Sequence, residues 1–465
     1  MLMAVSYFTS KNVTSETFFT GNRNSKWYMV AFAMIGTTIS GVTFISVPGE
    51  VGHSGWTYLQ FLLGNFVGYW VIALVLIPLY YKLQVVSIYT YLDQRFGVRS
   101  YKTGSFFFLV SRTIGASFRM YLVAGVLQLA FFDKLGIPFV VTVAIAIFMI
   151  WAYTFRAGIK TVIWTDSLQT TFLLASVVLT IVIISRQLDM NVGQMITAID
   201  EHPFSKIFDW DWRSKTNFFK QFIAGLGIVI VMNGLDQDIM QKSLTCKNMK
   251  DAQKNIYWFS GAFIFVNLLF LSLGVMLYIF AQQMGISVPE KTDDFFPLLA
   301  LNHFGTIAGV LFLLGIISAT YSSSDSALTA LTTSFSIDFL NLDPKDPASK
   351  LSRMKVHVGF SVLMFLVIIL FRMINNESVV TAVFKVAGYT YGPLLGLFAF
   401  GILTKKQVYD RYVPYLGLLS PVLTYIVNVN SEAWLGGYKF GFELLLLNGL
   451  IMFTGLLLLS RKEKV

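Results

Sequence analysis

The chain is dominated by apolar segments that are each long enough to cross a lipid bilayer. A membrane-spanning helix needs about 20 mostly apolar residues, and such segments recur along all 465 residues. Over the whole sequence 55% of the residues are hydrophobic, only 13% are charged, and the mean hydropathy is +0.66. Because the bilayer core offers no partners for an open backbone, each segment is expected to be helical. The sequence therefore predicts an all-α polytopic membrane protein.

Hydropathy predicts about 13 transmembrane helices, of which the first is truncated. Residues 1–10 are interpreted as the remnant of that first helix, and the chain as a single transmembrane domain over 1–465. The full spans are predicted at 26–50, 55–82, 104–133, 137–155, 160–186, 218–240, 254–284, 305–340, 354–375, 377–403, 411–430 and 441–460.

Basic residues gather in every second loop between these spans. They are Lys11, Arg23 and Lys26; Lys82, Arg95, Arg99 and Lys102; Arg156 and Lys160; Lys242, Lys247, Lys250 and Lys254; Lys345, Lys350, Arg353 and Lys355; Lys405, Lys406 and Arg411; and Arg461, Lys462 and Lys464. The positive-inside rule then places the C-terminus in the cytoplasm and the N-terminus outside, in a multi-pass protein of the inner (plasma) membrane. The formal charge of +10 therefore reflects topology, and we expect no nucleic-acid partner.

The sequence offers little for catalysis. The lone cysteine, Cys246, lies in a basic loop, and the four histidines are scattered without metal-ligand spacing. The predicted spans contain no nucleophile beside a base. We therefore expect no enzyme, although a transporter-like sensor remains a weaker alternative.

Residues 315–339 form a helix of small residues with hydroxyl groups where hydrocarbon would be expected. Ala319, Ser322, Ser323 and Ser326 follow one another at i, i+3, i+4 and i+7, which places them on one helical face beside Asp325. Such a stripe is either packing contact between helices or the wall of an ion site.

The first full span is interrupted halfway by Thr37, Thr38, Ser40 and Gly41. A helix broken there would free backbone carbonyls at mid-membrane, where they could bind a cation. The alternative is a continuous helix whose Thr and Ser hydroxyls bond back to the preceding turn.

Several motifs, in order and at family spacing from about 18 to 406, resemble the sodium/solute symporter family. They are FFTGNRNSKW, SIYTYLDQRFGVRSYK, YTFRAGIKTVIWTDSLQ, LDQDIMQKSLTCKNMKDAQKN, FFPLLALNHFG and GPLLGLFAFGIL. The resemblance implies a five-plus-five inverted repeat like that of the leucine transporter. The first repeat would cover 26–186 and the second 218–403, flanked by extra helices that include the two C-terminal ones over 411–460.

The resemblance also implies a first sodium site made of neutral oxygens. The carbonyls of Gly36 and Ile39 would face the carbonyl of Ala319 and the hydroxyls of Ser322 and Ser323. Such a set suits a monovalent hard cation, whereas several carboxylates would favour a divalent one. We therefore expect a sodium ion as the coupling cofactor.

Some members of the family carry a second sodium, and Asp166, Ser322 and Ser326 match its pattern here. Asp325 stands where the best-described example has another serine. The extra carboxylate would strengthen this site or make coupling partly proton-dependent. Asp166 could instead be a structural hydrogen-bonding group.

Two arginines of the third full span, Arg112 and Arg119, lie two turns apart on one face. Arg119 matches the position at which sialic acid carriers of the family hold the substrate carboxylate, and an arginine fork suits a carboxylate. Alternatively, the arginines brace neighbouring carbonyls or Asp166. Further candidate substrate contacts are Thr43, Gln60, Asn65, Asn233, Gln237 and Lys385.

The resemblance, together with these residues, implies a sodium-coupled symporter that imports a small polar solute by alternating access. A carboxylate-bearing solute is favoured, such as a sialic acid, a sugar acid or a monocarboxylate. The alternatives are a neutral sugar, polyol or amino acid, or proton coupling on the same fold. The expected partners are the solute, sodium and the lipid bilayer, and the oligomeric state stays open, with a monomer as one option.

Overall fold

The computed structural model describes residues 23–83, 87–154, 159–342, 349–374 and 377–461. Nearly all regular structure in these ranges is helical, apart from one short antiparallel pair, β1 (Gln407–Val408) and β2 (Ser460–Arg461). The main helices are α3 (Trp27–Thr38), α4 (Gly41–Ser54), α5 (Tyr58–Val71), α6 (Ile77–Leu83), α8 (Val98–Leu127), α9 (Phe139–Thr154), α10 (Ile159–Gln187), α12 (Phe218–Val229), α13 (Gln237–Ser243), α14 (Met249–Met284), α16 (Thr306–Ser334), α17 (Ser349–Ile374), α18 (Val379–Thr390), α19 (Gly392–Leu403), α20 (Val413–Val429) and α22 (Leu444–Leu458). Shorter helices are α7 (Thr90–Arg95), α11 (Val192–Asp200), α15 (Phe295–Asn302) and α21 (Ser431–Trp434).

The predicted all-α polytopic architecture is confirmed, with fewer clear spans than the sequence suggested. Within the described ranges, 7 helices are long and apolar enough to cross a membrane, or up to 9 if each bent pair counts as one span. Three shorter apolar helices cover Trp27–Thr38, Phe139–Trp151 and Leu444–Leu458. The predicted total of about 13 is larger because it counted short and interrupted helices as full spans. The expected helix remnant at 1–10 lies outside the described residues.

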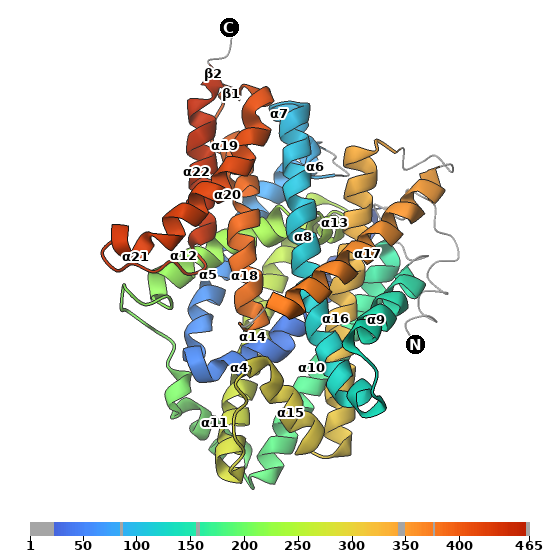
Figure 1. Cartoon of the computed structure of the whole chain (residues 1–465), viewed down its shortest axis with the longest axis vertical. Helices are drawn as coiled ribbons and strands as arrows, with labels where there is room; N and C mark the ends of the chain where they lie inside the picture. The colour runs from blue at the N-terminus through green and yellow to red at the C-terminus, as the bar shows by residue number, and fades with distance from the viewer. Residues whose placement is uncertain (1–22, 84–86, 155–158, 343–348, 375–376, 462–465) are drawn as a thin grey trace.

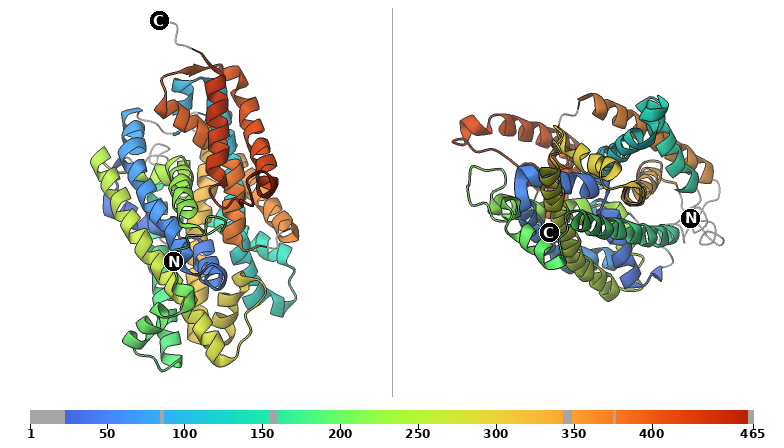
Figure 2. Two further views of the ribbon diagram at one scale, coloured as in Figure 1. Left: turned by 90° about the vertical axis from the view of Figure 1, so that its left-hand side faces the viewer. Right: turned by 90° about the horizontal axis from the view of Figure 1, so that it is seen from below.

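The helices form an elongated bundle (Figures 1 and 2). Helices α19, α20 and α22 pack together at the end where the C-terminus leaves the molecule, and the short helices α11 and α15 lie at the opposite end (Figure 1). The strand pair β1–β2 ties the segment after α19 to the end of α22.

Three of the apolar segments are broken rather than straight. Helices α3 and α4 are separated at Ile39 and Ser40. Helix α12, with its π-helical extension over Ile230–Gly234, meets α13 at an angle of 72°, and α18 meets α19 at 50°. The first segment of each predicted half is therefore interrupted, and such breaks leave backbone groups free for ligands.

Candidate functional site

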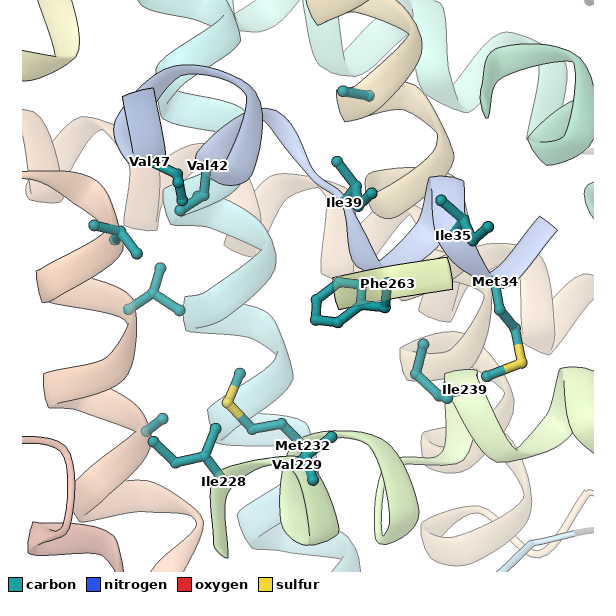
Figure 3. Packing of buried hydrophobic residues seen from close by; sticks show 14 of the residues in the cluster. Met34, Ile35, Ile39, Val42, Val47, Ile228, Val229, Met232, Ile239 and Phe263 are labelled. Atoms are coloured by element: carbon teal, nitrogen blue, oxygen red, sulfur yellow. The ribbon is translucent and has the colours of Figure 1, made fainter. Parts of the chain in front are cut away.

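The break between α3 and α4 leaves backbone carbonyls outside the helical hydrogen-bond pattern. The chain leaves the helix at Ile39 (φ −80°, ψ 87°) and is extended at Ser40 (φ −85°, ψ 179°). The N–H of Ser40 donates to the carbonyl of Thr38 at 3.1 Å, so the carbonyl of Gly36 loses its usual i+4 donor. Figure 3 shows Ile39 on the non-helical link between the two helical pieces. The predicted break is therefore present, and the alternative of a continuous helix is wrong.

Helices α10 and α16 enclose this link. A Cβ atom added to Gly36 would lie 2.1 Å from the Thr170 hydroxyl and 3.1 Å from the Asp166 carbonyl, both on α10. One added to Gly41 would lie 2.8 Å from the Thr320 hydroxyl on α16. Glycine is therefore required at both positions because the neighbouring helices approach so closely.

Several buried hydroxyls around the link have no hydrogen-bond partner in the described part of the chain. They include those of Thr38 on α3 and of Thr320 and Ser326 on α16. Buried polar groups are nearly always paired, so these unpaired hydroxyls beside freed carbonyls are candidate ligands for an ion. The hydroxyl of Ser323 is buried and donates to the Thr320 carbonyl at 3.2 Å.

Of the residues expected at the first sodium site, Gly36 and Ile39 lie at the break, and Ala319 and Ser323 lie buried on α16 on either side of Thr320. The side chain of Ser322 lies outside the described residues. The helix that carries the hydroxyl stripe, α16, is also closely packed against α10, as the packing alternative expected. A Cβ atom added to Gly315 would lie 2.7 Å from the Ser176 hydroxyl of α10.

At the place expected for a second sodium, the carboxylate of Asp166 already has a cationic partner. The ammonium of Lys242 lies 2.7 Å from the Asp166 Oδ2 atom, and both side chains are 0% exposed. The hydroxyl of Thr37 donates to the same carboxylate at 2.9 Å. Asp325 and Ser326 are also buried, and the Ser326 N–H donates to the Asp325 carboxylate.

The sequence-based placement of Lys242 in a basic loop is wrong. The chain turns by 72° after the π-helical segment, and α13 returns into the bundle with all of its residues buried. Aspartates at 236 and 238 and a lysine at 242 share one short segment, and this spacing of opposite charges could have indicated buried pairing.

A central cavity of about 80 Å³ lies between the broken helices. It is lined by residues of α3, α4, α5, α8, α12, α13, α14 and α18 and of the π-helical segment. Five of the eight predicted substrate contacts line it: Thr43, Asn65, Arg112, Arg119 and Asn233.

The other three predicted substrate contacts are engaged elsewhere. The Gln60 amide donates to the Thr216 carbonyl at 2.9 Å and so holds the segment before α12. The Gln237 side chain accepts from the N–H of Ile88 at 2.9 Å. Lys385 is 56% exposed and pairs with Glu377 at 3.0 Å.

The two arginines of α8 differ in their surroundings. Arg112 contacts the carboxylates of Asp236, at 3.6 Å, and of Asp238, and the hydroxyl of Tyr391 donates to Asp236 at 3.2 Å. The side chain of Arg119 makes no hydrogen bond or ion pair with any described residue, and it lines the central cavity. Arg112 is therefore a structural partner of α13, whereas the guanidinium of Arg119 remains available to a ligand.

Two larger cavities, of about 370 and 270 Å³, lie toward the end that carries α11 and α15. Glu50 and Thr381 line both of them. Tyr58 and Val380 line both the smaller one and the central cavity, so those two cavities adjoin. We call the two larger cavities the vestibules.

One carboxylate of the vestibules is strongly influenced by burial. Asp293 lies in the loop before α15 and accepts a hydrogen bond from the N–H of Val379, at 2.8 Å, at the start of α18. Burial raises the pKa of Asp293 to about 6, against the opposing effect of this hydrogen bond.

This arrangement of a broken helix, adjoining helices and a central cavity agrees with known transporters. A profile of the sodium:solute symporter family matches residues 18–409. The chain belongs to the sodium:solute symporter family. The symporter is therefore a membrane transporter and not an enzyme, as the sequence predicted, and its transported ligands are sodium and a small solute. Sodium is thus a transported ion and not a resident cofactor, which corrects that expectation.

Known relatives of this symporter include carriers of organic acids. The sodium/sialic acid symporter NanT of Aliivibrio fischeri is 27% identical over 95% of this chain and 87% of its own. The sodium/sialic acid symporter SiaT of Proteus mirabilis is 24% identical over 87% of this chain and 83% of its own.

Solved structures show the same fold. A sodium-coupled sialic acid symporter, described as substrate-bound and outward-open with a novel sodium site, gives a TM-score of 0.81 at 22% identity, over 99% of this chain and 96% of its own. Mhp1, a nucleobase-cation-symport-1 family transporter, gives 0.60 at 12% identity over 95% of this chain and 94% of its own. The symporter therefore has the leucine-transporter-like fold.

Proposed function

We propose that this symporter imports a small carboxylate-bearing solute together with sodium by alternating access. The substrate class is inferred from Arg119. Its guanidinium lines the central cavity and has no carboxylate partner in the described chain. An unpaired charge in a largely buried site is costly. A carboxylate that accepts two parallel hydrogen bonds from this guanidinium would remove that cost.

The neighbouring charges favour the same assignment. The carboxylates of Asp236 and Asp238 form ion pairs with Arg112, and neither forms one with Arg119. A hydroxyl and two amides also line the cavity, from Thr43, Asn65 and Asn233. These groups can form hydrogen bonds with the polar remainder of an organic acid. The sialic acid carriers among the relatives support this class of solute.

The size of the central cavity bears on how the solute enters. At about 80 Å³ the cavity is smaller than typical ligand pockets, which measure about 300–1,000 Å³. A sialic acid would therefore need the cavity to widen toward the adjoining vestibule, whereas a short monocarboxylate would need less rearrangement.

We place the first sodium at the break of α3 and α4, between the carbonyls of Gly36, Ile39 and Ala319 and the hydroxyls of Ser322 and Ser323. The freed Gly36 carbonyl and the close approach of Gly41 to Thr320 support this placement. Sodium there would hold the broken helix against α16, and so would favour one conformation of the carrier.

We also propose that 26–186 and 218–403 are inverted repeats, since each begins with a broken helix. With the C-terminus in the cytoplasm of an inner membrane and the N-terminus outside, the vestibules open to the outside. The structure then corresponds to an outward-facing state, in which sodium and solute are loaded.

The decisive experiment measures thermal stability of the purified protein in sodium and in potassium, with sialic acid, sugar acids, monocarboxylates and neutral sugars as probes. A ligand at 100 times its Kd stabilises by roughly 2.7 kcal/mol, which is measurable. We expect sodium to stabilise the wild type but not Ser323→Ala, and one class of carboxylate to add stability only in sodium. Equal stability in sodium and potassium would contradict the sodium site.

The substrate assignment is tested with Arg119→Gln in the same assay. We expect this variant to keep the response to sodium and to lose the response to the carboxylate. Lys385→Gln is the matched control, because it removes an exposed cation that pairs with Glu377, and it should respond like the wild type. A solute response that survives in Arg119→Gln, or that is given by a neutral sugar alone, would overturn the carboxylate assignment.

A further inference from the structure

The ion pair between Lys242 and Asp166 is the most enclosed pair of opposite charges in the described chain. Both side chains are 0% exposed, and the two charged groups lie 2.7 Å apart. Lys242 also donates to the hydroxyl of Thr37. Placing an ammonium and a carboxylate where water cannot reach them carries a large desolvation cost, so packing alone does not explain why these residues occupy the interior.

The pair lies directly beside the first sodium site that we propose. Asp166 contributes its backbone carbonyl to the surface against which Gly36 packs. Thr37, which follows Gly36 in the chain, donates its hydroxyl to the Asp166 carboxylate at 2.9 Å. The ammonium of Lys242 thus contacts the residue next to a proposed sodium ligand, among oxygens that would otherwise suit a small cation.

The three residues come from helices in both halves of the chain. Thr37 is on α3 and Asp166 on α10, whereas Lys242 is on α13, which follows the 72° bend. A charged side chain from the second broken helix therefore reaches the wall of the first one. An ammonium supplies one positive charge to these oxygens, as a sodium ion would, but it stays attached to the protein.

We propose that Lys242 is a built-in cation that occupies the position of a second coupling ion at Asp166, so that the protein binds and moves one sodium in each cycle. This inference rests on the proposed first sodium site. Lys242 acts as a specificity-determining residue for ion stoichiometry, because its charge neutralises the carboxylate that a second sodium would need.

The test counts sodium ions bound to purified protein by radioactive sodium binding at saturation. We expect about one sodium per wild-type chain and about one in Lys242→Arg, which keeps the positive charge. Lys242→Met leaves the Asp166 carboxylate without its cation, so a second sodium should bind there and bring the total to about two. The double variant Asp166→Asn/Lys242→Met removes both charges, and should bind about one again.

Thermal stability of the same variants shows whether the extra ion binds at Asp166. Lys242→Met leaves a buried carboxylate without its cation, so it should be destabilised in potassium and recover in sodium to a greater extent than the wild type. The double variant should lose this additional recovery. Because it carries neither charge, it also shows whether the packing tolerates methionine at this position.

Each outcome separates the two proposals. No saturable sodium binding by the wild type would overturn the first site itself. Two sodium ions bound to the wild type, or one bound to a folded Lys242→Met protein, would overturn the role of Lys242 and leave the first site intact. A Lys242→Met protein that does not fold in sodium, beside a folded double variant, would also overturn it, because sodium then fails to replace the ammonium.

Discussion

Single residues in this symporter show how costly charges are held inside a membrane protein. Arg112 is paired with carboxylates from α13, and Lys242 is paired with Asp166. Breaking a buried pair by removing one partner typically costs about 3–5 kcal/mol. Arg119 differs from these residues because it has no such partner among the described residues, and this difference is the reason to assign it to the solute.

Asp293 predicts a pH dependence of stability. Its folded-state pKa of about 6 lies above its ordinary value of 3.8, so the folded protein binds this proton more tightly than the unfolded chain. Acidification from about pH 6 to about pH 4 should therefore stabilise the folded state through this group, and raising the pH should remove that contribution. Thermal unfolding of the wild type and of Asp293→Asn between pH 4 and pH 7 measures it as the difference between the two curves.

The asparagine can still accept the hydrogen bond from Val379, so Asp293→Asn isolates the charge. The advantage of the variant should be largest near pH 7 and should shrink toward pH 4. Glu432→Gln is the control, because Glu432 is exposed and pairs with Lys439 at 3.2 Å, and it should not change the slope. A constant difference between Asp293→Asn and wild type across this range would contradict the prediction.

At the scale of the elements, the sequence predicted the break between α3 and α4 and missed the two bends, between α12 and α13 and between α18 and α19. The α3–α4 break was predictable because hydroxyl residues and glycine interrupt an apolar run. The turn before α13 was not predicted, since 218–240 was taken as one span with a basic loop after it. Hydropathy analysis assigns a charged residue such as Lys242 to a loop. It cannot show that Asp166, far away in the chain, supplies the opposite charge that allows Lys242 to be buried.

The bend between α18 and α19 depends on a residue from a helix that sequence analysis left without a role. Asn448 of α22 is fully buried and donates to the carbonyls of Gly388 at 3.0 Å and of Tyr389 at 2.7 Å. These carbonyls belong to the last turn before the bend. Asn448→Ala should leave buried acceptors without a donor and should cost about 1–3 kcal/mol, measured by thermal unfolding.

Asn428→Ala is the matched control for this prediction. Asn428 also bonds to α18, but it does so through the Tyr389 hydroxyl at 2.8 Å and is only partly buried, so water can replace it. Its replacement should cost clearly less than that of Asn448. Equal losses for both variants would show that Asn448 has no special role at the bend.

At the scale of the whole molecule, the central cavity draws its walls from both halves of the chain. Its five predicted contacts come from α4, α5 and α8 in the first half and from the π-helical segment before α13 in the second. Family motifs predicted the fold, and the hydroxyl residues and glycine of the first span predicted its break, because both signals can be recognised in short stretches of sequence. Which charged side chains pair with one another was not predictable in this way. The pairing of Arg112 with Asp238, for example, depends on how helices that are distant in the sequence pack together.

The same architecture predicts that sodium controls access to the vestibules. Thr381 lines both of them, and the single cysteine, Cys246, is fully buried, so Thr381→Cys provides one accessible thiol. If sodium holds α3 and α4 against α16 in the outward-facing form, a maleimide should label this thiol faster in sodium than in potassium. A tenfold difference would correspond to a shift of about 1.4 kcal/mol in the conformational equilibrium.

The wild type should stay unlabelled, and adding Ser323→Ala should abolish the difference. Faster labelling in potassium would mean that sodium favours the opposite conformation.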